Sequence, residues 1–161
     1  MSEKNDLTLA LKLFQKAYEF QMASDFDSAE EYYRKSIDVY PTAEAYTFLG
    51  WTNSFQGKLD EAIAQCKKAI EIDPDFGNPY NDIGAYLIEL GEYDEAIPWL
   101  EKAILAKRYE PRHYPHFNLG RIYLAKGMIN KALEELGKSL DVCPDYVFAK
   151  EAIDKIKLSL N

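Results

Sequence analysis

A short phrase that recurs at a nearly constant interval constrains this chain more than any other feature. The phrase reads YTFLG, YNDIG and HFNLG in three places, and its final glycines, Gly50, Gly84 and Gly120, stand 34 and 36 residues apart. A second phrase, which reads GKLDEAI, GEYDEAI or GMINKAL, follows each glycine at the same offset. A period of this length is typical of stacked supersecondary units, each of which buries its apolar face against the next.

Each copy of the repeat predicts two helices. Apolar residues at i, i+3 and i+7, such as Tyr80, Ile83 and Leu87, form one stripe of a first helix. Gly91 then suits the left-handed residue that ends a helix, and the acidic residues after it suit the positive end of a second helix dipole. Pro74 closes its unit because proline cannot continue a helix. The repeat therefore predicts a chain of helical hairpins.

The pattern resembles the tetratricopeptide repeat, in which bulky, Leu-Gly, aromatic, small and proline positions recur over ~34 residues. The bulky position holds Leu13, Tyr46, Tyr80 and His116, and the small position of the second helix holds Ala29, Ala62, Ala96 and Ala132. Two positions depart from the pattern, since Lys16 replaces Leu and Asn53 replaces the aromatic residue. The resemblance implies an all-α fold, a right-handed solenoid of four helical-hairpin units that ends in a capping helix.

The repeat divides the chain into six segments. They are an N-terminal extension at 1–9, units at 10–42, 43–76, 77–112 and 113–146, and a capping helix at 147–161. The unit at 77–112 is two residues longer than the one before it, which predicts an enlarged turn around 106–111. Residues 147–158 are amphipathic at helical spacing, so we expect them to cover the last unit, whose apolar face would otherwise be exposed.

Charge and composition exclude several classes of function. Lys+Arg 19 against Asp+Glu 27 gives a net charge of -8, which disfavours binding to nucleic acid. No apolar run approaches the ~18 residues that a membrane-spanning helix needs, and the acidic N-terminus is unlike a secretory signal. We therefore expect no membrane insertion. Cys66 and Cys143 show neither metal-site nor disulfide spacing, which together with these features predicts a cytoplasmic protein.

If the geometry implied by the resemblance holds, one face of each first helix lines the concave side of the solenoid. Aromatic residues gather on that face, together with amide and guanidinium donors. The candidate partner-binding residues are Phe14, Tyr18, Trp51, Phe55, Asn78, Asn81, Tyr114, Phe117 and Arg121. One interpretation is a groove for a segment of a partner protein, because buried aromatic anchors supply much of the binding energy at interfaces. The other is that these aromatics pack inside the stack or beneath residues 7–11.

The sequence carries no constellation typical of an enzyme or of a cofactor site. His113 and His116 have i, i+3 spacing, but no cysteine or acidic cluster completes a metal site beside them. Chaperone-binding members of the family grip a C-terminal carboxylate with Lys and Asn residues. The matching positions here hold Phe14, Tyr18, Asn81 and Ala85, so we do not expect that ligand. No catalytic residue, metal or cofactor is predicted.

The sequence therefore favours a non-catalytic adaptor or scaffold that binds a peptide or helix of another protein in an aromatic-lined concave groove. The alternative is a structural subunit that associates with a second copy of itself through the N-terminal helical surface at 7–20.

Overall fold

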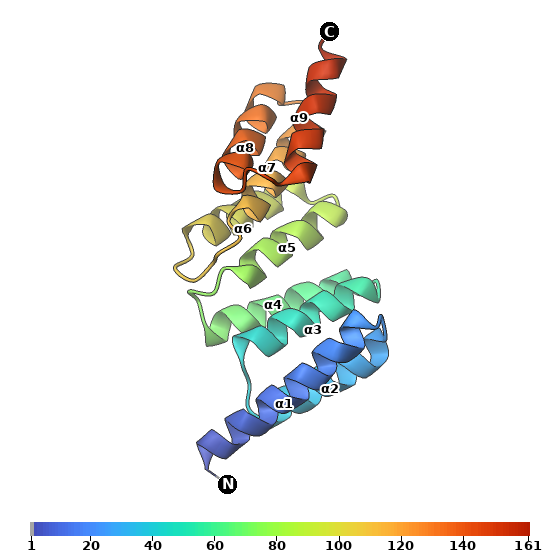
Figure 1. Ribbon diagram of the computed structural model, residues 1–161, viewed down its shortest axis with the longest axis vertical. Helices are drawn as coiled ribbons and strands as arrows, with labels where there is room; N and C mark the ends of the chain where they lie inside the picture. Colours follow the sequence, from blue (N-terminus) through green and yellow to red (C-terminus); the bar gives the residue numbers. More distant parts are fainter. Residues whose placement is uncertain (1) are drawn as a thin grey trace.

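The computed structural model describes residues 2–161 and folds this range into nine α-helices, with no β-strand. The helices are α1 (Glu3–Met22), α2 (Phe26–Val39), α3 (Ala43–Phe55), α4 (Leu59–Ile72), α5 (Asn78–Glu89), α6 (Tyr93–Leu105), α7 (His113–Ala125), α8 (Ile129–Val142) and α9 (Val147–Ser159). They follow one another along an elongated stack with the two chain ends at opposite tips (Figure 1). The predicted all-α helical repeat solenoid is confirmed.

The helices pack mainly as hairpins. The closest neighbours are α1 with α2, α3 with α4, α5 with α6 and α7 with α8, while α9 packs on α8. Residues 147–159 of the predicted capping segment 147–161 form α9, which packs on the last hairpin through α8. The first helix begins at Glu3, so most of the predicted extension 1–9 is part of α1, and its first residue, Met1, lies outside the described residues.

Three glycines that were predicted to end the first helices have a left-handed backbone. The φ angle is +79° at Gly91 and takes similar values at Gly57 and Gly127. In the divergent first hairpin Ser24 occupies this place with a φ of +61°, a conformation that residues with a Cβ rarely adopt. The same turn is therefore made in all four hairpins, although glycine is absent from the first.

Small residues allow the paired helices to approach closely. Ala62, Ala96 and Ala132 of the second helices are completely buried. On α5, a Cβ added at Gly84 would lie 2.4 Å from Cδ2 of Leu100. The glycine of the repeated phrase is therefore required by the packing of one helix against its partner.

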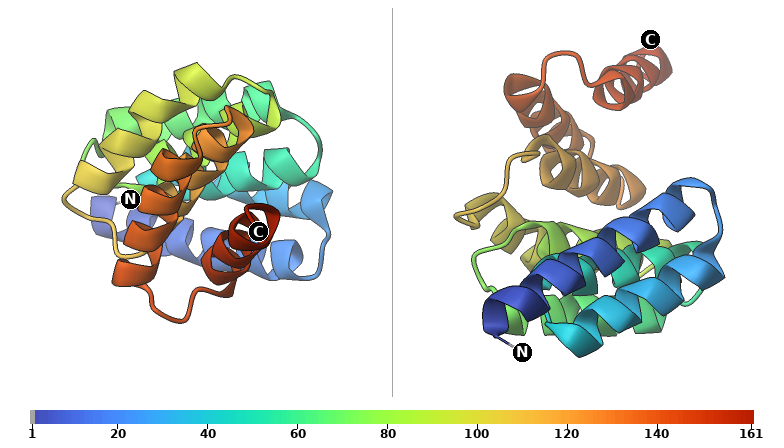
Figure 2. Two further views of the ribbon diagram at one scale, coloured as in Figure 1. Left: turned by 90° about the horizontal axis from the view of Figure 1, so that it is seen from above. Right: turned by 60° about the horizontal axis from the view of Figure 1, so that its bottom comes forward.

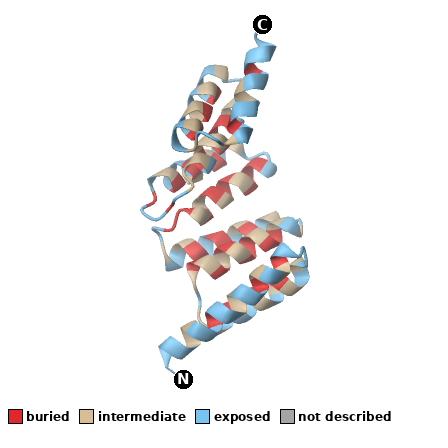
Figure 3. Ribbon diagram, viewed as in Figure 1, coloured by how far each residue is buried: buried red, intermediate tan, exposed pale blue. Residues whose placement is uncertain are grey.

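The apolar core runs through the stack and is not confined to each hairpin. One buried cluster joins Cys66 of α4, Ile83 of α5, Leu100 of α6 and Ile122 of α7. Figure 3 shows buried residues on the interior faces of successive helices. Because neighbouring hairpins share this core, each one contributes to the stability of the next.

The longer connection between α6 and α7 is fixed by backbone and arginine contacts. The N–H of Gly77 donates to the carbonyl of Arg108 at 3.1 Å, and the N–H of Arg108 donates to the carbonyl of Asp75 at 2.9 Å. The guanidinium of Arg112 donates to three backbone carbonyls in and beside the connection. These contacts hold the start of α7, and with it Tyr114, against the preceding hairpin.

Candidate functional site

A cleft lies where α1, α3, α5 and α7 come together, and we name it the first-helix cleft. It has a volume of about 500 Å³. Its lining residues are Tyr18 of α1, Thr47, Phe48 and Trp51 of α3, Asn78, Asn81 and Asp82 of α5, and Tyr114 of α7. Seen along the stack, successive hairpins are rotated relative to one another (Figure 2, left). This winding brings Tyr18 and Tyr114 to one site, although they are far apart in the sequence.

Three rings, Tyr18, Phe48 and Trp51, form an aromatic wall on one side of the cleft. The centroid of the Phe48 ring lies 5.8 Å from that of Trp51 and 6.0 Å from that of Tyr18, and both contacts are edge-to-face. Behind the wall, the ring of Phe14 packs against Phe48 at 5.2 Å. Edge-to-face contacts of this kind fix the orientation of the rings. The aromatic wall is therefore organised before any ligand arrives.

The amide side chains of Asn78 and Asn81 on α5 form a second, polar side of the cleft, and Asn118 of α7 supports that of Asn81 from behind. The Nδ2 of Asn118 donates to Oδ1 of Asn81 at 3.1 Å, and both side chains are buried. The guanidinium of Arg121 donates in turn to Oδ1 of Asn118, also at 3.1 Å. This chain of hydrogen bonds ties α5 to α7 and holds the Asn81 amide at the edge of the cleft.

The structure brings together five of the predicted site residues. Tyr18, Trp51, Asn78, Asn81 and Tyr114 line the cleft, whereas Phe14, Phe55, Phe117 and Arg121 do not. The ring of Phe55 stacks on that of Phe26 of α2, with a centroid distance of 4.8 Å. Phe117 contacts Tyr146 at 5.2 Å and packs against the apolar cluster between α8 and α9. Phe55 also packs edge-to-face on Trp51, but neither Phe55 nor Phe117 lines the cleft itself.

The cleft also contains a carboxylate that helical periodicity did not single out. Asp82 is half-buried, and burial raises its pKa to about 7. No Lys or Arg of residues 2–161 forms an ion pair with it. Asp82 occupies the third position of the repeated phrase, where the other two copies have Phe48 and Asn118. This difference between copies was the signal that could have identified it.

The ionisable groups that surround Asp82 offer no compensating positive charge. The phenols of Tyr18 and Tyr114 line the same cleft. Three further groups are the thiol of Cys66 on α4, the phenol of Tyr86 on α5 and the phenol of Tyr109 in the α6–α7 connection. Burial raises the pKa of each of these three groups, so all are neutral near pH 7. An ionised Asp82 is therefore an uncompensated charge in the free protein.

The ionisation of Asp82 should reduce the stability of the chain as pH rises from 3.8 to about 7, because the folded state holds this proton more tightly than the unfolded state does. The whole difference between the folded and unfolded pKa of Asp82 corresponds to about 4 kcal/mol in the free energy of unfolding. Solvent at the open side of the cleft should reduce this effect to about 1–2 kcal/mol. The Asp82→Asn variant lacks the ionisation, so its free energy of unfolding should rise relative to that of the native chain across this range. Urea unfolding at several pH values measures the difference, and a difference that stays constant with pH would contradict the assignment.

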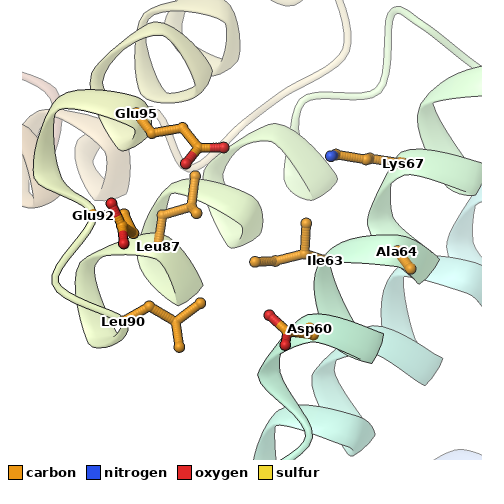
Figure 4. Close-up of a pocket in the computed structure, with 8 residues that line it drawn as sticks. All are labelled: Asp60, Ile63, Ala64, Lys67, Leu87, Leu90, Glu92 and Glu95. Carbon is orange, nitrogen blue, oxygen red and sulfur yellow. The ribbon is translucent and has the colours of Figure 1, made fainter.

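A second cleft of about 600 Å³ lies between α4 and the turn that joins α5 to α6, and we name it the α4–α6 cleft. Its lining residues are Asp60, Ile63, Ala64, Lys67, Leu87, Leu90, Glu92 and Glu95. Figure 4 shows Ile63 and Leu87 directed into the space from opposite sides. This cleft contains no aromatic ring and none of the predicted site residues, so it provides a comparison site for the experiments below.

Within residues 2–161, no three His, Cys, Asp or Glu side chains are grouped so that they could hold a metal ion. His116 pairs with Glu135, at 2.8 Å between Nδ1 and Oε2, and the ring of His113 packs against that of Tyr114. The described part of the chain also has no helix with the length and apolar character needed to cross a membrane.

Family models described as "Tetratricopeptide repeat" match residues 43–76 and 75–145. The small glutamine-rich tetratricopeptide repeat-containing protein 2 of Mycosarcoma maydis is 34% identical over 101 residues, which are 62% of this chain and 28% of that protein. The protein SGT1 homolog of Oryza sativa subsp. japonica is 40% identical over 78 residues, which are 48% of this chain and 21% of that protein. The chain thus spans less than a third of the length of these two relatives.

A solved structure gives the same fold. The crystal structure of PilW, a type IV pilus biogenesis factor, has a TM-score of 0.85 and 20% identity, with coverage of 93% of this chain and 69% of that one. At this level of identity the likeness concerns the fold alone.

Proposed function

Because the chain belongs to the tetratricopeptide repeat family, we propose that it is a non-catalytic scaffold that binds an extended segment of another protein in the first-helix cleft. The observation that carries this proposal is the composition of the cleft. Its lining side chains come from the first helix of every hairpin and combine an aromatic wall with the amides of Asn78 and Asn81. Aromatic anchors supply binding energy at interfaces, and amides can donate to and accept from a peptide backbone.

The amides favour an extended segment over a helical one. A helix satisfies its own backbone N–H and C=O groups, whereas an extended peptide presents them to its surroundings. A cleft of about 500 Å³ also holds only a few side chains. The two cysteines are free, which supports a reducing compartment as the place where the protein works.

The proposal can be tested with random short peptides displayed on phage and selected on the native chain. The chain has two tryptophans, and Trp99 lies on α6, away from the cleft. In the Trp99→Phe variant, Trp51 is the sole tryptophan, so a selected peptide bound in the cleft should shift its fluorescence emission. A Leu90→Ala change in the α4–α6 cleft should leave this binding intact. Peptides that bind without any effect on Trp51, or that depend on Leu90, would contradict the proposal.

Self-association through the N-terminal helical surface stays the second candidate. Leu9 and Leu11 of α1 have exposed fractions of 39% and 54%, which leaves apolar surface on the first helix. Sedimentation velocity at several concentrations separates the two functions, because a strict monomer excludes this one. A dimer that a Leu11→Glu change dissociates would support it.

A further inference from the structure

We propose that the first-helix cleft selects a segment that carries a basic side chain, best an arginine, whose guanidinium pairs with the carboxylate of Asp82. This inference rests on the proposed function above and specifies the chemistry of the partner. Asp82 is the one charged residue among those that line the cleft, and no Lys or Arg lines it. A half-buried carboxylate without a cation nearby is complementary to a positively charged ligand group.

None of the four arginines of the chain pairs with Asp82, and each has another partner. Arg34 pairs with Glu30, Arg108 pairs with Glu44 and Asp73, Arg112 donates to backbone carbonyls, and Arg121 donates to the amide of Asn118. The lysines that form ion pairs do so with carboxylates outside the cleft, as Lys58 does with Glu30 and Lys126 with Asp94. In the free protein, Asp82 is therefore available to pair with a cation of the partner.

The surroundings of Asp82 favour arginine over lysine. The cleft is lined by the aromatic wall and, from α7, by Tyr114. A planar guanidinium can lie on an aromatic face and donate two parallel hydrogen bonds to a carboxylate, whereas an ammonium is a compact and more strongly hydrated charge. One arginine side chain could thus satisfy the carboxylate and the aromatic rings together.

The negative charge of Asp82 disfavours acidic ligands. A segment that ends in a free carboxylate, or that carries acidic side chains, would meet the like charge of Asp82 within the cleft. Arg121 donates to Asn118, forms no ion pair with Asp82 and does not line the cleft. The partner segment should therefore be basic and should not place a free C-terminal carboxylate in the cleft.

The experiment uses a peptide recovered from the phage selection and a version in which citrulline replaces its arginine. Citrulline has nearly the same shape but no charge. The peptide should lose about 10- to 100-fold in affinity on Asp82→Asn and a similar factor on the change to citrulline. The two changes together should cost no more than either alone, because they remove one and the same contact. Glu95→Gln, which removes a carboxylate from the α4–α6 cleft, should leave the affinity unchanged.

The outcomes distinguish this inference from the proposed function. Selected peptides that shift the emission of Trp51 but carry no basic residue, or effects of the two changes that add fully, would overturn the pairing with Asp82 and leave the scaffold function standing. If no selected peptide affects Trp51, both proposals are overturned. Thermal unfolding of Asp82→Asn serves as the folding control, since this variant should melt at or above the temperature of the native chain near neutral pH.

Discussion

A Trp51→Ala variant should bind the selected peptide at least about 30-fold more weakly than the native chain does, which is the loss expected for a central aromatic anchor at an interface. Trp51 is half-buried and stands in the aromatic wall, with its ring against Phe48 and Phe55. Truncation removes the indole face on which a ligand group can lie, and it also loosens the neighbouring rings. Isothermal titration calorimetry measures the affinity without depending on tryptophan fluorescence.

Phe55→Ala is the matched control for this prediction. Phe55 stands one helical turn after Trp51 on α3, and 54% of its surface is exposed. Its ring stacks on Phe26 of α2 and touches the Trp51 ring edge-to-face, but it does not line the cleft itself. We therefore expect its removal to change the affinity by less than about 3-fold, as is usual for peripheral contacts. Equal losses of affinity in Trp51→Ala and Phe55→Ala would mean that the ligand covers the C-terminal end of α3 and not the cleft.

The fold follows from the sequence because the repeated phrase specifies local structure and packing together. The glycine that ends each phrase is forced by the close partner helix, as at Gly84 beside Leu100. The glycines that end the first helices take the left-handed backbone that their positions predict. Ser24 was not predictable in this role, because residues with a Cβ rarely adopt a positive φ.

The candidate site follows from the sequence only in part. Helical periodicity identifies the face on which Tyr18, Trp51 and Tyr114 lie, and all three line the cleft. The angle between neighbouring hairpins decides which further rings reach it, and no local pattern encodes that angle. Phe117 consequently packs against the cluster at α9 and not in the cleft. Asp82 was missed for a different reason, because the selection on that face was confined to aromatic rings and to amide and guanidinium donors, and a carboxylate is neither.

A Gly84→Ala variant should be destabilised by about 3 kcal/mol, the upper range for overpacking a well-packed core. The added Cβ would lie 2.4 Å from Cδ2 and 2.6 Å from Cγ of Leu100, so this completely buried side chain would have to shift within the core. For a chain of this size the loss corresponds to a melting temperature lower by roughly 6–12 °C. Thermal unfolding followed by circular dichroism measures the change.

Gly137→Ala separates packing from helix propensity. Gly137 lies inside α8, and a Cβ added there would meet nothing within 4 Å. This variant should gain up to about 1 kcal/mol, because alanine is a better helix former than glycine. A gain in stability at both positions would mean that the hairpin of α5 and α6 can open to admit a methyl group.

A Leu100→Val change, which shortens the opposing side chain, should recover part of the stability that Gly84→Ala loses. The double variant should therefore be more stable than the sum of the two single effects predicts. Such coupling would assign the repeated glycine to the seam between the two helices.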